Sequence, residues 1–457
     1  MKDNSYRLEK DSMGSVQVPE WACWGAHTQR AIENFSVSPY TVPLQLREAL
    51  ALIKLAAAEA HRLKGSLSTE TARAIQSAAE EVLQGKLEDH FPVDVFQTGS
   101  GTSWNMNMNE VIARRAVDRL GGTERVHPND HVNRGQSSND VIPAATNIAA
   151  RRSAIGLSEN LQSLCRAFNK KAEEFQRHLK LGRTHLQDAV PMRVSQEFSA
   201  WAEQIKRSEV RLREQFYALE ELPIGGTAVG TGLNSSVEWA KCAVELIADR
   251  TSIPFRPSSN PFVQISARDE QLSLMGALNG IAAVLMKIAQ DFRLLSSGPR
   301  AGLAELQLPE QQPGSSIMPG KVNPVIPEMV VQAAAFVMGK QTSVTIAAHN
   351  GPLQLNIMQP LIAHEVLTSI DLLKHVVKRF EEKCVKDVTL PGERTSEAIE
   401  KSLALVTPLA VRIGYDAAAK LAYKAYNEGK SVRQVVLDEG VLSLEEAEEV
   451  LNPEKMC

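Results

Sequence analysis

The segment between residues 274 and 295 limits most strongly what this chain can fold into. Apolar side chains recur there in alternating steps of four and three residues, at Leu274, Leu278, Ile281, Leu285, Ile288, Phe292 and Leu295. This heptad spacing predicts one long helix with a continuous apolar seam. The positions off the seam are also mostly apolar, among them Met275, Ala282, Ala283, Val284, Met286 and Ala289. A helix that is apolar nearly all round has to be buried inside a large structure.

Two further segments show the same helical rhythm. Their apolar-periodic positions are Leu157, Leu161, Leu164, Phe168, Ala172 and Phe175, and Phe198, Trp201, Ile205, Ser208, Leu212 and Leu219. Aromatic residues make up only 5% of the chain, and alanine, the strongest helix former, is abundant. We therefore expect an all-α fold in which a long-helix bundle packs against copies of itself, with a monomeric helical core as the alternative.

Polar segments between the helical ones predict three domains. We expect a mostly helical N-terminal domain at 1–131, a central bundle of long helices at 132–385, and a small helical C-terminal domain at 386–457. The turn-forming stretch TLPGER opens the last of these, and shorter helical segments at 396–406 and 414–428 follow it.

Net charge, cysteine content and apolar runs indicate which partners and which compartment to expect. The net charge is −4, so we expect neither a nucleic-acid partner nor a membrane partner, since both would favour a basic excess. The five cysteines are scattered and indicate free thiols in a reducing compartment. The N-terminus lacks the apolar core of a signal peptide, and the apolar run at 272–289 is interrupted by Asn279 and Lys287. A cytoplasmic protein is the expectation, with an organelle matrix as the alternative.

Four polar segments interrupt the helical pattern and share one composition. They read QTGSGTSWNMNMNE at 97–110, HPNDHVNRGQSSND at 127–140, GRTHLQD at 182–188 and GSSIMPGKVNPVIPE at 314–328. Each offers hydroxyls, amides or glycine N–H groups, which can hold a carboxylate in a site closed to water. Any one of them alone could be a set of helix N-caps. Their recurrence beside predicted buried helices favours a site for a small dianion.

Two residues in these segments are candidates for chemistry. His185 lies in a dense polar motif, and histidine is the side chain most often used as a general acid or base, although a capping or surface histidine is the alternative. Lys321 lies among glycines and prolines, which would hold it as a fixed charge rather than a solvated one. We found no HExxH, CxxC or EF-hand pattern, and GSGT and GGTAVGTG have no Walker lysine, so we expect no metal and no cofactor.

These motifs together resemble the fumarase/aspartase superfamily. GSSIMPGKVNP matches its signature, and QTGSGT, HPNDHVN, QSSND, GRTHLQDAVP and GGTAVGTGLN match it in the expected order. The resemblance runs nearly end to end, and the SSN at 137–139 is most similar to the class II fumarate hydratases. It implies a homotetramer whose long helices form a shared core and whose active sites are each assembled from three subunits. It also implies reversible hydration of fumarate to (S)-malate through an enediolate.

The resemblance also assigns roles residue by residue. Ser315 would be the base that removes the proton beside a carboxylate, Lys321 and Asn323 would stabilise the enediolate, and His185 with Glu328 would activate water. The residues that would hold the substrate carboxylates are Ser100, Thr102, Ser137, Ser138, Asn139, Thr184, Lys321 and Asn323. His127, Asn129 and Asp130 match a second, peripheral dicarboxylate site.

Alternatives remain open at this point. Aspartate ammonia-lyase would share the base and the carboxylate clamp, and a non-catalytic structural member of the superfamily is the third interpretation. The chain also departs from the family pattern at His27, Trp104, Val141 and Arg193. None of these positions has a catalytic role in the assignment, but they bear on which substrate fits.

Overall fold

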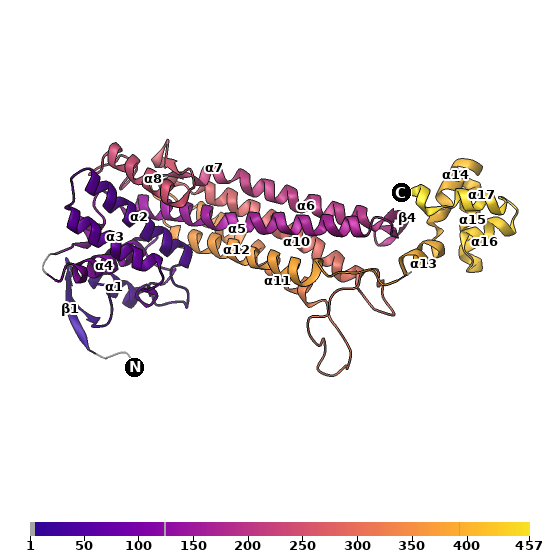
Figure 1. Cartoon of the computed structure of the whole chain (residues 1–457), viewed down its shortest axis with the longest axis horizontal. Coiled ribbons are helices and arrows are strands. Elements are labelled where there is room, and N and C mark those ends of the chain that lie inside the picture. The colour runs from indigo at the N-terminus through magenta and orange to yellow at the C-terminus, as the bar shows by residue number, and fades with distance from the viewer. Residues whose placement is uncertain (1–4, 123–124, 393) are drawn as a thin grey trace. The chain divides into compact units, whose positions relative to one another are not determined.

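The computed structural model describes residues 5–122, 125–392 and 394–457, and these are mostly helical (Figure 1). Backbone contacts divide the chain into two units. Unit 1 holds the residues up to 158, 210–282 and 335–374, and unit 2 holds 159–209, 283–334 and 375–457. The division into three domains expected from the sequence stays a prediction.

Long helices contribute residues to both units. They are α5 (Ser138–Glu174), α6 (Val194–Glu214), α10 (Asp269–Leu295), α11 (Val325–Ala348) and α12 (Gln359–Phe380).

Unit 1 adds shorter elements to its shares of the long helices. They are β1 (Tyr6–Asp11), β2 (Gly14–Pro19), α1 (Ala26–Phe35), α2 (Leu44–Leu63), α3 (Thr69–Leu83), η1 (Glu88–His90), α4 (Thr102–Arg119), the π-helix η2 (Pro128–Val132), α7 (Phe216–Leu219), β5 (Glu221–Leu222), α8 (Val237–Thr251), β6 (Arg256–Pro257) and α9 (Pro261–Ser266). Strands β1 and β2 pair antiparallel, and β5 and β6 pair parallel. Helices α2 and α3 contact each other, and buried alanines such as Ala56, Ala60 and Ala79 let their backbones approach closely.

Unit 2 contains an antiparallel hairpin and a set of small C-terminal helices. The hairpin is β3 (Leu179–Thr184) with β4 (Gln187–Arg193), and the remaining elements are η3 (Glu381–Val385), α13 (Arg394–Lys401), η4 (Leu403–Val406), α14 (Thr407–Ile413), α15 (Tyr415–Glu428), α16 (Val432–Asp438), α17 (Leu444–Val450) and η5 (Pro453–Met456). Ser431 and Ser443 begin α16 and α17 with reciprocal capping boxes. Leu181 of β3 joins the apolar core that these small helices share.

Buried aromatic rings pack against one another in unit 2, and we name them the aromatic cluster: Phe168, Phe198, Trp201, Phe292 and Phe380, each at most 1% exposed. The rings of Phe198 and Trp201 lie 4.8 Å apart between centroids, and those of Trp201 and Phe292 lie 5.0 Å apart. The first pair packs edge to face and the second is tilted, and aromatic contacts at these distances add to the stabilisation from burial alone.

Every heptad position expected along α10 is buried, with Leu274 and Leu278 at 0% exposed and Leu295 at 7%. Among the described residues, α10 is also the one helix long and apolar enough to cross a membrane by length and composition. A core helix of a water-soluble protein meets the same criterion, so this property by itself does not identify a membrane-spanning helix. The neighbouring helix in sequence, α11, exposes large apolar side chains, with Phe336 and Ile346 each 57% exposed.

All four polar segments hold more regular structure than the loops expected from their sequences. Helix α4 begins at Thr102, inside the 97–110 segment, and α5 begins at Ser138, inside the 127–140 segment. The 182–188 segment forms the tip of the β3–β4 hairpin. In the fourth segment α11 begins at Val325, because Pro327 falls in its first turn, where a missing N–H breaks no helical hydrogen bond.

Removing one ring of the aromatic cluster tests whether it stabilises unit 2. We expect Phe292→Ala to lower the free energy of unfolding by about 3–5 kcal/mol, because the ring is fully buried and leaves a cavity. Urea unfolding at fixed protein concentration measures this change. The control is Val411→Ala, a side chain that is 92% exposed and whose loss should change the free energy by about 0.5 kcal/mol or less. Equal effects of the two substitutions would contradict the role of the cluster.

Candidate active site

The site residues expected from the sequence fall into two groups. The loop group, in unit 1, contains Ser100, Thr102, Ser137, Ser138 and Asn139, together with His127, Asn129 and Asp130 of the second site. The base group, in unit 2, contains Thr184, His185, Ser315, Lys321, Asn323 and Glu328.

The glycines of the QTGSGT motif place the first hydroxyls of the loop group. Gly99 packs so closely on Ile357 that a Cβ would lie 1.9 Å from the carbonyl oxygen of that residue. Gly101 has a φ of +74° and precedes α4, and a Cβ there would lie 3.0 Å from Cγ1 of Ile142 in α5. Both positions therefore require glycine. The backbone between them places the hydroxyls of Ser100 and Thr102 at 2.7 Å from each other.

The start of α5 supplies the second part of the loop group. Asn105 Nδ2 of α4 donates to Ser138 Oγ at 3.1 Å, and Asn139 Nδ2 donates to the carbonyl of Ala228 at 2.8 Å. Ser138 is buried, while Ser137 and Asn139 are half-buried. The N-terminus of a long helix carries unpaired N–H groups and a partial positive charge, so it favours an anion.

Asp140, which the sequence analysis did not select, ties this helix start to a further motif. Its carboxylate is fully buried and accepts the backbone N–H of Ser137 at 2.9 Å, of Gly225 at 3.1 Å and of Thr227 at 2.9 Å. Burial raises the pKa of Asp140 to about 6, against the lowering effect of these hydrogen bonds. The GGTAVGTG segment is therefore anchored to the start of α5 by one carboxylate.

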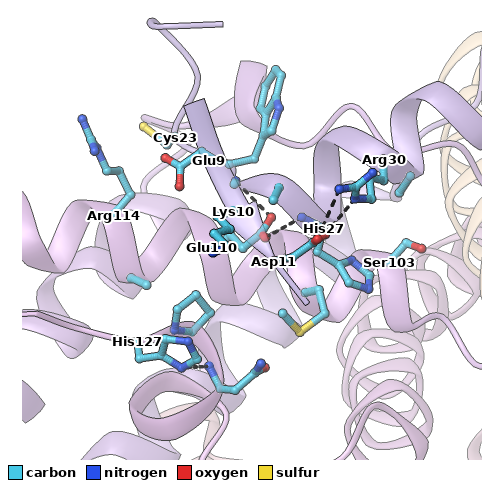
Figure 2. A pocket seen from close by; sticks show the side chains of 18 of the residues that line it. Glu9, Lys10, Asp11, Cys23, His27, Arg30, Ser103, Glu110, Arg114 and His127 are labelled. Atoms are coloured by element: carbon cyan, nitrogen blue, oxygen red, sulfur yellow. Dashed lines mark hydrogen bonds and ion pairs between the residues drawn. The ribbon is translucent and has the colours of Figure 1, made fainter. Parts of the chain in front are cut away.

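The expected second site lies beside a cavity of about 750 Å³ in unit 1 (Figure 2). His127 and Asn129 line this cavity, and Asp130 does not. His127 Nδ1 caps η2 by accepting the backbone N–H of Asn129 at 3.3 Å and of Asp130 at 3.2 Å.

Most charged groups in the cavity wall already have partners. Arg30 Nε donates to Asp11 at 2.8 Å, which holds the pKa of that carboxyl below its usual range. Glu110 accepts the backbone N–H groups of Gly25, His27 and Thr28 and so caps α1 (Figure 2). His27, one of the departures from the family pattern, lines this cavity rather than joining either group of site residues.

The β3–β4 hairpin presents Thr184 and His185 of the base group. Thr184 pairs with Gln187, and the two residues between them have positive φ angles, +56° at His185 and +62° at Leu186. Two-residue turns with both φ angles positive favour Asn-Gly, so a His-Leu pair is strained. Backbone strain of this kind concentrates at functional sites, where the surrounding structure enforces it.

A buried carboxylate holds strand β3 of this hairpin. Glu305 is 3% exposed, and its Oε1 lies 2.6 Å from Nη2 of Arg183, the residue directly before Thr184. Its Oε2 lies 3.3 Å from Lys180 Nζ, which also contacts Glu197 Oε2 at 2.7 Å. These ion pairs join β3, α6 and the segment after α10, and the sequence analysis selected none of their members.

The signature loop closes on itself at its two ends. The N–H of Gly314 donates to the carbonyl of Lys321 at 2.7 Å, and Asn323 Nδ2 donates to the carbonyl of Gly314 at 2.6 Å. A Cβ at Gly314 would lie 2.6 Å from the Lys321 oxygen, so the closure requires glycine.

Ser315 stands at the closed end of this loop with two donors aimed at its oxygen. Ser315 Oγ accepts the backbone N–H of Ile317 at 3.2 Å and of Met318 at 3.0 Å. Such donors stabilise negative charge on the oxygen, as the donors of an oxyanion hole do. A serine is a poor base in water, and this environment makes its deprotonated form less costly.

Lys321 is exposed and Glu328 is half-buried in the first turn of α11. Within one copy of the described chain, no hydrogen bond joins His185 to Glu328.

The described residues also contain no group of three or more His, Cys, Asp or Glu side chains that could hold a metal ion. All five cysteines are free thiols, as expected.

Three of the departures from the family pattern have structural explanations. Trp104 is 1% exposed, and its Nε1 donates to the carbonyl of Val93 at 3.1 Å. Val141 is fully buried, and Arg193 Nη2 pairs with Glu454 at 2.8 Å. The two buried side chains fill the core of unit 1, and the arginine lies at the base of the hairpin.

Comparisons with known proteins identify the family of this chain. A family model described as "Lyase" matches residues 14–339, and one described as "Fumarase C C-terminus" matches residues 405–457. Class II fumarate hydratase of Thermus thermophilus is 44% identical over 99% of this chain and 98% of its own. Mitochondrial fumarate hydratase of Danio rerio is 44% identical over 99% of this chain and 90% of its own.

The crystal structure of class II fumarase from Schistosoma mansoni superposes with a TM-score of 0.96 at 39% identity and covers 99% of both chains. Family model, sequence relatives and solved structure therefore agree over nearly the full length of the chain. The chain belongs to the fumarase/aspartase lyase family and, within it, to the class II fumarate hydratases.

Proposed function

We propose that this protein catalyses the reversible hydration of fumarate to (S)-malate. The observation that carries the proposal is Ser315, whose Oγ accepts two backbone N–H groups inside a closed loop that also carries Lys321. A binding protein for dicarboxylates would have no need of a serine whose anionic form is stabilised. The named relatives, which are fumarate hydratases, support the same reaction.

Dehydration of malate requires removal of a weakly acidic proton beside a carboxylate. Ser315 Oγ accepts this proton, and the electron pair moves onto the carboxylate oxygens to form an enediolate. Lys321 and the second amide hydrogen of Asn323 stabilise the added charge. The hydroxyl then leaves as water with a proton from His185, which Glu328 orients. Hydration of fumarate runs through the same steps in reverse.

The loop group holds the second carboxylate of the substrate. Ser100, Thr102 and Ser138 offer hydroxyls, and Asn139 offers an amide, at or beside the N-termini of α4 and α5. Neutral donors of this kind bind a dianion without the large desolvation cost of burying further charged groups. Thr184 adds a hydroxyl from the hairpin. We keep His127, Asn129 and Asp130 as a second dicarboxylate site.

We also propose a homotetramer in which different copies supply the two groups of one site. The apolar faces that α10 and α11 expose support this proposal, because partner helices would cover side chains such as Phe336 and Ile346. A cytoplasmic location fits the free thiols, although relatives occur in bacteria and in mitochondria.

Loss of the ultraviolet absorbance of fumarate tests the reaction directly. With purified protein in phosphate-free buffer, we expect fast loss without ammonium and malate as the product. Loss that requires ammonium and yields aspartate would assign the chain to the aspartate ammonia-lyases. No loss under either condition would contradict both enzymatic assignments and favour a non-catalytic member of the family.

Replacing the proposed base tests its role. Ser315→Ala should lower kcat by at least about 10²–10³-fold, because it removes the proton acceptor together with the charge that the loop stabilises. The matched control is Ser316→Ala, which removes the adjacent, exposed hydroxyl and should leave kcat within a few-fold of wild type. Near-normal turnover by the Ser315 variant would contradict the assignment.

A further inference from the structure

Lys54 on α2 is a fully buried lysine whose hydrogen-bond partners are neutral. It is 0% exposed, and its Nζ donates to Asn133 Oδ1 and to Gln136 Oε1, each at 2.9 Å. Lysine is almost never buried without a paired charge, because desolvation of the ammonium is costly. Both acceptors lie in the segment that leads directly into the Ser137–Ser138–Asn139 motif, so the ammonium is placed behind the loop group.

A chain of hydrogen bonds through two asparagine side chains connects Lys54 to Ser138, which is proposed to bind the substrate. Asn133 Oδ1 also accepts from Asn105 Nδ2 at 3.2 Å, and the same Nδ2 donates to Ser138 Oγ at 3.1 Å. Since Ser138 Oγ is an acceptor in this chain, its own hydrogen remains for a substrate carboxylate. The lysine fixes the orientation of Asn133, and Asn133 fixes that of Asn105.

The groups packed around Lys54 include one other charge. Helix α4 contributes Asn105, the segment after η2 contributes Asn133 and Gln136, and α5 contributes the Asp140 carboxylate. Burial lowers the pKa of Lys54 to about 7, against the raising effect of Asp140. The ammonium is therefore present below about pH 7 and is lost above it.

We propose that Lys54 is a positioning residue for the dicarboxylate: its ammonium holds the Asn133–Gln136 segment, directs the Ser138 hydroxyl toward a substrate carboxylate and places positive potential behind the start of α5. This inference rests on the proposed function and deepens it. Lys54 itself does not contact the substrate, so its effect falls on binding more than on the chemical step.

The stability of a Lys54 variant distinguishes a role in binding from a purely structural role, in which loss of the lysine would lower the stability of the protein. Because burial makes the pKa of Lys54 lower in the folded protein than in the unfolded chain, the buried ammonium opposes folding; this opposition is full below about pH 7 and weakens as the pH rises above 7. Lys54→Met keeps the length of the side chain and removes the charge. If Lys54 serves binding, this variant keeps the wild-type unfolding midpoint or raises it while binding weakens.

The experiment compares wild type, Lys54→Met and Lys171→Met as full-length proteins. Lys171 is 7% exposed and contacts Glu174 and the carbonyl of Val388 in unit 2, so its variant is a matched buried-lysine control. We expect Lys54→Met to raise KM for fumarate about 10-fold or more, the effect typical of losing a hydrogen bond to a charged group, with kcat within a few-fold of wild type. Lys171→Met should leave KM unchanged.

The pH profile supplies the readout that structural damage alone would not produce. In wild type, KM should rise as the pH increases through about 7 and Lys54 loses its proton, and this rise should be absent in Lys54→Met. An unchanged KM in Lys54→Met would overturn the proposal. A lower unfolding midpoint with equal losses of kcat and kcat/KM, and with the wild-type pH profile of KM retained, would also overturn it.

Calorimetric titration with succinate, which cannot be hydrated, separates this proposal from the proposed function. Succinate binding that is weaker in Lys54→Met than in wild type supports the role of Lys54 even if fumarate is not turned over. In that case the hydratase function alone is contradicted. Wild type that neither binds succinate nor turns over fumarate would overturn both proposals.

Discussion

Helices α10 and α11 carry more apolar surface than one copy of this chain covers, and the proposed active site depends on that excess. The seam of α10 is buried within the chain, yet the side chain of Leu294 on the same helix is 42% exposed. Phe336 and Ile346 of α11 have a larger exposed fraction, 57% each. Apolar surface of this extent favours association with further helices. Copies that associate through their long helices can bring the loop group of one chain to the base group of another.

Buried polar contacts hold each group in shape. Asp140 joins the start of α5 to the GGTAVGTG segment, and Glu305 holds strand β3 of the hairpin that presents His185. The signature loop closes through Gly314, which leaves two backbone N–H groups aimed at Ser315 Oγ. Buried carboxylates with several donors give a specific geometry, because their hydrogen bonds cannot be exchanged for water. A dianionic transition state requires donors that are already in place.

The sequence predicted the long helices, and the reasons are local. The residues of the loop group and the base group were assigned by resemblance to the family, and their roles stay predictions. Heptad positions such as Leu278 and Phe292 are recognisable because their spacing depends only on the helix. The hairpin at 182–188 was not predicted, because His185 and Leu186 are unfavourable residues for a two-residue turn. Lys54 could not be distinguished from a solvated lysine, since its burial depends on Asn133 and Gln136, about eighty residues further along the chain. Asp140 offered a weak signal, as a carboxylate directly before the apolar run at 141–145.

Recovery of activity from two inactive variants tests the central claim most directly. Ser315→Ala removes the base of one group, and Asn139→Ala removes an amide of the other, so each variant alone should be nearly inactive. Co-expressed in one cell, they should form mixed assemblies in which some sites combine an intact loop group with an intact base group, and hydratase activity should return. Co-expression of Ser315→Ala with Lys321→Met, which alters the same loop, should restore nothing. Activity that stays at the level of the single variants in the first mixture would contradict the account of a site shared between copies.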